Sequence, residues 1–177
     1  TLAHARALLD DVPVHLEPDD PSRSMQALRA LALWAARFSP VVAIDPPDGL
    51  LIDIGGCQHL FGGEKPMLRR LLKELHRMGF DARAASAPTF ACAWAMARFA
   101  RPALSTVAAG GVIEALSPLP IPALRIDDKS VSALAELGVQ QIGQLLKLPR
   151  RALPSRFGNQ LLLRLDQALG AAMEMIE

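Results

Sequence analysis

The sequence of 177 residues predicts an α+β fold in which a mixed strand-and-helix part is followed by an all-helical part. Up to about residue 118, short apolar runs of strand length alternate with stretches of helical periodicity. Beyond it, apolar residues recur only at helical spacing, between short connections that contain Gly or Pro. Hydrophobic residues make up 51% of the chain, enough to predict a sizeable core.

Composition restricts the class of protein further. A net charge of +1 gives no global electrostatic attraction to nucleic acid, although it leaves room for a local basic face. Cys57 and Cys92 stand alone, without metal-ligand spacing, and are expected to be reduced, buried thiols of a cytosolic protein. No apolar run approaches the roughly 18 residues of a membrane span, and no signal peptide is visible. The chain opens at Thr1, without Met, inside a helical pattern, and we interpret it as an internal piece of a longer protein.

The first 40 residues predict helices joined by a polar loop. A short helix is expected over residues 2–9, a short extended segment over 12–16, and a loop over 18–24. A helix from Met25 onward has an apolar stripe at 3.6 spacing, and Pro40 ends it. Trp34 and Phe38 are interpreted as core anchors.

Residues 41–44 and 50–54 predict a pair of strands around the turn-forming segment 46–49, Pro-Pro-Asp-Gly. Three acids, Asp45, Asp48 and Asp53, lie within nine residues. Carboxylates at the ends of neighbouring strands could hold Mg²⁺ for phosphoryl transfer. They could equally be turn formers and a strand-end residue bonded to nearby backbone N–H groups. Spacing alone leaves both interpretations open.

The next segment predicts a βαβ unit made of residues 49–54, 66–78 and 80–87, right-handed by the general rule. Arg69, Arg70, Lys73, His76 and Arg77 lie on the polar faces of its helix, for which a solvated surface is the expected role. A helix capped by Thr89 then runs to about Ala100, and residues 104–108 predict a short edge strand.

The remainder predicts helices over 112–116, 128–137, 140–147 and 158–169, with a turn at 149–153. Residues 119–122, Leu-Pro-Ile-Pro, are interpreted as a linker, which places a domain boundary near residue 118. Asp128 is expected to cap the helix that follows it.

Several phrases, taken in order, resemble the Y-family (DinB/UmuC-type) translesion DNA polymerases over nearly the whole chain. They are DGLLIDIGG at 48–56, LFG at 60–62, the helix ending RP at 101–102, and LGVQQIGQL at 137–145. The resemblance implies the remainder of a fingers domain over 1–40, a ferredoxin-like palm over 41–118, and a helix-hairpin-helix thumb over 119–177. The family's first palm strand and little finger would lie outside the chain.

Two departures from the family fall on groups that serve catalysis. The family's palm phrase holds an adjacent Asp and Glu that bind the catalytic metals; here Asp48 matches the Asp and Gly49 the Glu. Taking Asp45 as the counterpart instead puts Pro46 at the Glu position. The family's phosphate-contacting Lys is matched by Trp94, which cannot neutralise a phosphate. The resemblance therefore implies a vestigial metal site, with no metal or other cofactor expected.

The thumb departs as well. The family's Gly-containing turn, which approaches DNA phosphate, is matched by residues 125–128, Arg-Ile-Asp-Asp, whose acids would repel it. Phosphate contacts would then rest on Arg150, Arg151, Arg156 and Arg164, for which a solvated face is at least as compatible. The phrase QLLKLP at 144–149 looks like a clamp-binding peptide, but its leucines are expected to pack inside a thumb helix.

The run GLLIDIGGCQHLFGGE at 49–64 is similar to the ImuB-type branch of the family, which serves bacterial damage-induced (SOS) mutagenesis. That similarity implies a non-catalytic adapter, cytoplasmic and nucleoid-associated when recruited, with no membrane contact. Implied partners are a sliding clamp, a RecA-like cassette protein, an error-prone replicative-type polymerase, and DNA. Two alternatives remain at this stage: an active polymerase using two Mg²⁺ ions, at Asp48 or Asp45, and a generic DNA-binding module.

Overall fold

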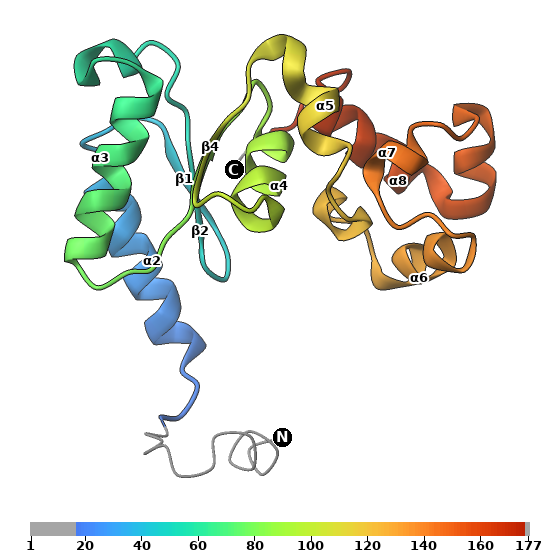
Figure 1. The fold of residues 1–177 in the computed structure, drawn as a ribbon. Coiled ribbons are helices and arrows are strands. Elements are labelled where there is room, and N and C mark those ends of the chain that lie inside the picture. Colours follow the sequence, from blue (N-terminus) through green and yellow to red (C-terminus); the bar gives the residue numbers. More distant parts are fainter. Residues whose placement is uncertain (1–16, 176–177) are drawn as a thin grey trace, which may run out of the picture.

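Two short pairs of strands form the centre of the first half of the computed structural model, which describes residues 17–175 (Figure 1). Strand β1 (Val42–Asp45) runs antiparallel to β2 (Gly49–Ile52), with Asp45 opposite Gly49 across the turn. Strand β3 (Ala84–Ser86) runs parallel to β4 (Leu104–Thr106). The hairpin predicted from 41–54 is confirmed.

The predicted βαβ unit is wrong in its pairing. Within residues 17–175 no ladder joins β2 to β3, and the parallel pair is instead β3 with β4, connected through α4 (Phe90–Phe99). The strand predicted over 80–87 shortens to three residues because its partner β4 is itself only three residues long. Three-residue ladders are too short to be recognised from alternation in the sequence.

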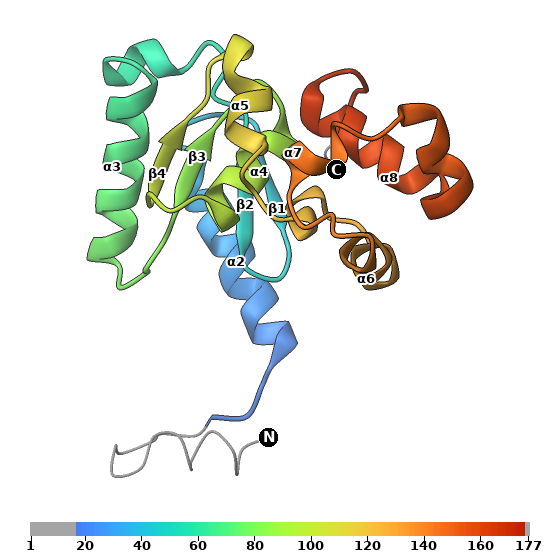
Figure 2. The same cartoon turned by 45° about the vertical axis from the view of Figure 1, so that its right-hand side comes forward.

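Helices α3 (Glu64–Arg77) and α4 lie on opposite sides of the strands (Figures 1 and 2). Thr89 caps α4 by accepting a hydrogen bond from the Cys92 backbone N–H, at 3.1 Å, as predicted. Buried side chains of α3, including Met67 and Leu75, face inward at helical spacing.

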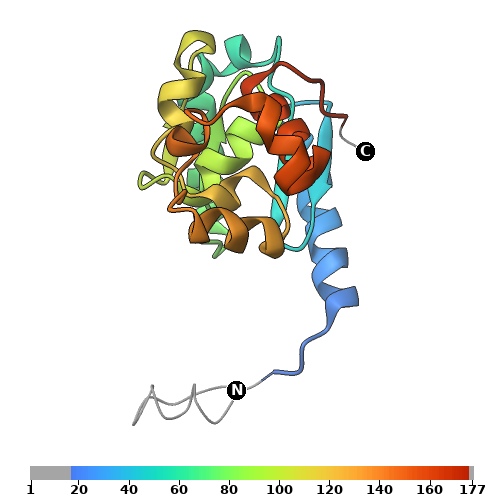
Figure 3. The ribbon, with the colours of Figure 1, turned by 90° about the vertical axis from the view of Figure 1, so that its right-hand side faces the viewer.

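Helix α2 (Pro21–Ala35) begins four residues before the predicted start, so the loop expected over 18–24 is partly wrong. Asp20 caps it, and Pro21 suits the first helical position. Figure 3 shows the first turns of α2 projecting away from the rest of the molecule. Phe38 is 2% exposed and packs between Trp34 and Phe61, which confirms it as a core anchor; Trp34 is only half-buried. The structure predicted for residues 2–9 and 12–16 lies outside the described residues.

The second half is helical, as predicted. Helix α5 (Val112–Leu116) ends the first half, and the second half contains α6 (Asp128–Glu136), α7 (Ile142–Leu145) and α8 (Leu153–Leu169). Single 3-10 turns lie in the first half at η1 (Gln58–Phe61) and η2 (Ala109–Gly111), and in the second half at η3 (Ile121–Leu124) and η4 (Arg150–Ala152). Gly158, with φ 76°, interrupts α8, so the predicted turn at 149–153 continues into an extra helical turn before the long helix.

Two predictions about this half are wrong. Asp127, not Asp128, caps α6, because its carboxylate accepts the Ser130 backbone N–H at 2.9 Å, which lowers the pKa of Asp127. The segment 119–122 is no exposed linker, since Leu119 is 5% exposed and Ile121 only 1%. Leu119 and Ile121 pack in the same hydrophobic core as the buried residues of α4.

One hydrophobic core continues across residue 118. It joins Ala91, Cys92 and Ala95 of α4 to Leu116 of α5 and to buried residues of the helices that follow, which include Leu134, Ile142, Leu145, Leu161 and Leu165. The division into fingers remainder, palm and thumb stays a prediction. No helix among residues 17–175 is long and apolar enough to cross a membrane.

The two thiols differ in burial. Cys92 is fully buried in α4, and the loss of solvation raises the pKa of its thiol to about 11. Cys57 is only half-buried, so the expectation that both thiols are buried is wrong for this one. Gly55 and Gly56, directly before it, are exposed, so the chain runs along the surface at this point.

Candidate functional site

The turn of the β1–β2 hairpin meets one face of α4. Asp45 ends β1 and Asp48 lies in the turn, while Trp94 and Arg98 stand four residues apart on α4 and therefore share a face. The Asp45 Oδ2 atom accepts a hydrogen bond from Trp94 Nε1 at 2.8 Å and another from Arg98 Nη2 at 3.2 Å. Asp48 Oδ1 accepts from the same Arg98 nitrogen at 2.7 Å. We call these four residues the Asp–Arg cluster.

Arg98 is the one cation of this cluster and faces two carboxylates. The hydrogen bond from Arg98 lowers the pKa of Asp48, against a smaller opposing effect of burial. The same bond raises the pKa of Arg98. The guanidinium also lies over the Trp94 ring, 4.8 Å from its centroid, a cation–π contact that fixes its position.

Gly49 lies against Asp45. A Cβ atom at position 49 would come within 2.7 Å of Asp45 Oδ2 and 3.0 Å of the Asp45 carbonyl oxygen. Atoms do not approach that closely, so a larger residue requires Asp45 or its backbone to move. Position 49, matched to the family's Glu only by resemblance, carries no side chain, and one would fit only if the Asp45 carboxylate moved.

The residues present do not fit a two-metal site. Such a site needs several carboxylate oxygens free to bind cations about 3.5–4 Å apart. Here the two candidate carboxylates already face a guanidinium, and the described residues hold no group of three or more His, Cys, Asp or Glu able to bind a metal. Asp53 accepts the Gly55 backbone N–H at 2.8 Å, as the structural interpretation predicted.

Trp94 also connects the cluster to the C-terminal part of the chain. Arg125, in the left-handed conformation with φ 57°, lies over the same ring at 5.4 Å. Arg125 donates to both carboxylate oxygens of Glu174, at 2.6 and 2.8 Å, and Arg164 donates to one of them at 3.1 Å. A continuous series of contacts thus runs from the hairpin turn through α4 to α8.

The four arginines predicted to contact DNA fall into two pairs. Arg150 is bound to Asp166 and Arg164 to Glu174, so neither guanidinium is free. Arg151 and Arg156 are exposed, and the described part of the chain offers them no ion-pair partner. Arg156 stands at the edge of an apolar pocket of about 220 Å³. Whether the four bind DNA stays a prediction.

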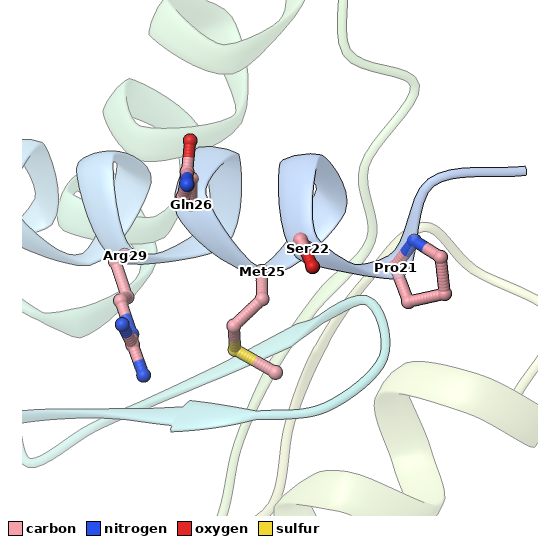
Figure 4. A pocket seen from close by; sticks show the side chains of 5 residues that line it. All are labelled: Pro21, Ser22, Met25, Gln26 and Arg29. Carbon is pink, nitrogen blue, oxygen red and sulfur yellow. The ribbon is translucent and has the colours of Figure 1, made fainter.

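A larger hollow, of about 440 Å³, runs along the first turns of α2 (Figure 4). Its lining comes from one helix and contains no carboxylate, histidine or thiol: Pro21, Ser22, Met25, Gln26 and Arg29. Ser22 supplies its one hydroxyl, and the lining contains no carboxylate or imidazole that could activate it as a nucleophile.

The sequence did not identify Arg98 or Arg125 as site residues. Trp94 was singled out only as the loss of a lysine, yet Arg98 lies on the same helical face four residues later. That spacing was the available signal for Arg98. The prediction that the 144–149 phrase packs inside the protein is confirmed for Leu145, which is 1% exposed.

Comparison with known proteins now adds to this geometry. No protein-family model matches the chain. Two ImuB proteins of Caulobacter vibrioides, from strains NA1000 / CB15N and ATCC 19089 / CIP 103742 / CB 15, are each 48% identical over 174 residues. The match covers 98% of this chain but 37% of the length of either relative.

A solved structure shares the fold. The crystal structure of DinB from Sulfolobus solfataricus superposes with a TM-score of 0.72, covering 99% of this chain and 52% of that one. At 17% sequence identity the likeness concerns the fold alone. The predicted α+β class and the resemblance to the Y family and its ImuB-type branch are confirmed.

Proposed function

Starting from a chain that is similar to ImuB and has the fold of a Y-family polymerase, we propose a non-catalytic homologue that acts as an adapter in damage-induced translesion synthesis. In this function the fold supplies surfaces for other proteins and carries out no nucleotidyl transfer. The observation that carries the proposal is the position of Arg98, hydrogen-bonded to both carboxylates of the hairpin turn.

Arg98 supports inactivity because a guanidinium does not replace a metal ion in this chemistry. Metal ions in two-metal sites coordinate the attacking and leaving oxygens and act as Lewis acids. A guanidinium has no vacant coordination position, and the Arg98 nitrogen that faces the turn already donates to Asp45 and Asp48. A cation bound at the turn would have to share both carboxylates with Arg98.

Gly49 and Trp94 support the same conclusion independently. Position 49 has no room for a carboxylate side chain while Asp45 keeps its place. The Trp94 indole N–H donates to Asp45 and carries no charge to attract a triphosphate. Removing groups that stabilise a transition state costs about tenfold in rate for each 1.36 kcal/mol lost.

The partners come from the resemblance to the ImuB-type branch. We infer a sliding clamp, a RecA-like cassette protein and a separate error-prone replicative-type polymerase that performs the synthesis. The chain spans 37% of the curated relatives, so these partners and the adapter activity belong to the proposal for the whole protein.

A primer-extension assay tests the absence of catalysis. The protein is incubated with a primed template, nucleotides and Mg²⁺ or Mn²⁺, and no incorporation is expected. Template-dependent extension that Asp48→Ala abolishes would show an active polymerase and overturn the proposal. The Gly49→Glu, Trp94→Lys double variant is also expected to be inactive, because the new side chain at 49 meets Asp45.

The adapter role has its own test. The immobilised protein is expected to capture the clamp, the RecA-like protein and the error-prone polymerase, and to do so equally well as an Asp45→Asn, Asp48→Asn variant. Capture of none of the three partners would contradict the adapter role. That result would not bear on catalysis, which the extension assay tests.

DNA binding by the thumb-like part is a second candidate function, favoured by Arg151 and Arg156, which are exposed and have no ion-pair partner among residues 17–175. The Arg151→Gln, Arg156→Gln variant is expected to weaken binding to a primed template and to lower its salt dependence. Unchanged binding would remove these two residues from any DNA interface.

A further inference from the structure

Helix α3 carries a regular line of positive charge. Lys65, Arg69, Lys73 and Arg77 follow one another at intervals of four residues, and all four are exposed. In an α-helix this interval corresponds to about 6 Å of rise, so the line is about 18 Å long. We call these four residues the basic stripe.

The stripe has no counterions within the described residues. One of the helix's two acids, Glu74, accepts from Arg70 at 2.9 Å and lies 3.8 Å from Arg37, neither of which belongs to the stripe. Arg70 is further held over the Phe61 ring. The other acid, Glu64, lies in the first turn of the helix. No described acidic side chain forms an ion pair with Lys65, Arg69, Lys73 or Arg77.

Charge is concentrated on this helix. With five Lys or Arg and two Glu, α3 has a net charge of +3, whereas the entire chain has +1, so the rest of the chain is net −2. Like charges four residues apart repel one another and destabilise a helix. The fold does not need them, because α3 packs through its buried Met67, Leu68 and Leu75. A line of cations that the fold does not use is a surface suited to an anionic partner.

The stripe belongs to a different face from the Asp–Arg cluster. Figures 1 and 2 show α3 on one side of the strands and α4, which supplies Trp94 and Arg98, on the other. The helices of the second half also lie on the α4 side. A partner on α3 therefore meets a surface separate from the thumb-like part.

We propose that the basic stripe of α3 binds the phosphate backbone of duplex DNA. Evenly spaced cations on a rigid helix match a continuous row of phosphates, and displacement of counterions supplies the binding free energy. Helix α3 contains no Phe, Tyr or Trp, and its one aromatic ring is the imidazole of His76, whereas single-strand binding relies on a series of aromatic stacking platforms. The proposal stands independently of whether the protein is an adapter or a polymerase.

The test compares two variants of equal charge. One replaces the stripe: Lys65→Gln, Arg69→Gln, Lys73→Gln and Arg77→Gln. The control replaces two Arg and two Lys that are exposed on other elements: Arg29→Gln, Arg101→Gln, Lys129→Gln and Lys147→Gln. Glutamine is a good helix former and relieves the repulsion, so the stripe variant is expected to melt at or above the wild-type temperature.

Binding is measured by fluorescence anisotropy with a labelled random-sequence duplex, the matching single strand and poly-glutamate over a series of salt concentrations. Wild type and control are expected to bind the duplex. Their plots of the logarithm of the binding constant against the logarithm of the salt concentration should be steeper than that of the stripe variant by about three to four units of slope. The stripe variant is expected to bind at least tenfold more weakly at low salt.

Three results would overturn the proposal. The first is equal duplex binding by the stripe and control variants. The second is stripe-dependent binding that favours the single strand over the duplex. The third is stripe-dependent binding of poly-glutamate without duplex binding, which would assign the surface to an acidic protein.

Discussion

Arg98 holds two carboxylates with a single nitrogen, and that arrangement determines the behaviour of the hairpin turn. Asp45 and Asp48 would repel each other without a cation between them, and Trp94 adds only a neutral donor. Asp48 is 64% exposed at its side chain, so water weakens its pairing with Arg98. The ion pairs of the cluster therefore stabilise the hairpin turn only modestly.

Arg98→Gln is expected to lower the free energy of unfolding at pH 7 by about 1 kcal/mol, within the range for partly exposed ion pairs. Because the folded pKa of Asp48 is lowered, its stabilising contribution is complete above the unfolded value of about 4 and is lost as pH falls through the folded value. The difference in free energy of unfolding between wild type and Arg98→Gln should therefore become smaller as the pH is lowered from 7 to 2.5. Urea unfolding followed by circular dichroism measures it.

Arg101→Gln is the matched control, because Arg101 is exposed just beyond the same helix and forms no ion pair with the described residues. It should leave stability unchanged at both pH values. A difference for Arg98→Gln that does not depend on pH would show that the charge on the aspartates contributes nothing.

Among the elements, α4 has the central position, because it packs on β3 and β4, supplies two members of the cluster and contributes to the main core. Thr89 fixes its first turn. The Thr89 hydroxyl accepts from the Cys92 N–H and donates to the Ala168 carbonyl at 3.0 Å, so it also ties α4 to the end of α8.

Thr89→Ala is expected to lower the free energy of unfolding by about 1–2 kcal/mol, since it removes a helix cap and leaves a backbone carbonyl without its donor. Thr89→Ser keeps the hydroxyl and should retain most of the stability. Thermal and urea unfolding measure both. Equal losses for Ala and Ser would assign the effect to the methyl group instead of the hydrogen bonds.

The elements also show how far the sequence could lead. Helices α3, α4 and α5 were predictable because their apolar spacing, Thr89 and the glycines act locally. The β1–β2 hairpin was predictable as well, but the pairing of β3 with β4 was not, because three-residue strands carry no register signal. The pairing of Asp48 with Arg98 spans 50 residues of sequence, and no local pattern specifies such a contact. The sequence therefore pointed to Asp48, Gly49 and Trp94 one by one, but it could not predict the cluster in which Arg98 joins Asp45 and Asp48.

At the scale of the molecule, the core that continues through residue 118 joins α4 to the helical second half. Trp94 of α4 lies in contact with that core, so its fluorescence reports on the unfolding of α4 and of the helical second half. Cooperative unfolding of the two halves is the physical consequence, because neither buries its apolar surface alone.

Leu134→Ala is expected to lower the free energy of unfolding by about 2–5 kcal/mol, because Leu134 is fully buried in α6. In a Trp34→Phe background, the Trp94 fluorescence transition in urea should shift by the same amount as the circular dichroism transition. The control is Leu137→Ala, three residues later and 55% exposed, with little expected effect. A Trp94 transition that stays in place would show that the two halves unfold separately.

The close approach of Gly49 to Asp45 affects how readily evolution could place a carboxylate at position 49. A mutation that adds a carboxylate at 49 meets an aspartate held by Trp94 and Arg98, so it destabilises the hairpin before it can serve any reaction. A mutation at Trp94 or Arg98 alone leaves Asp45 less restrained and creates no new ligand. Under the proposed function, a carboxylate at position 49 would find space only if Asp45, which Trp94 and Arg98 hold, also changed its position. If the proposed function is right, packing makes the loss of catalysis hard to reverse, and selection acts on the surfaces that remain.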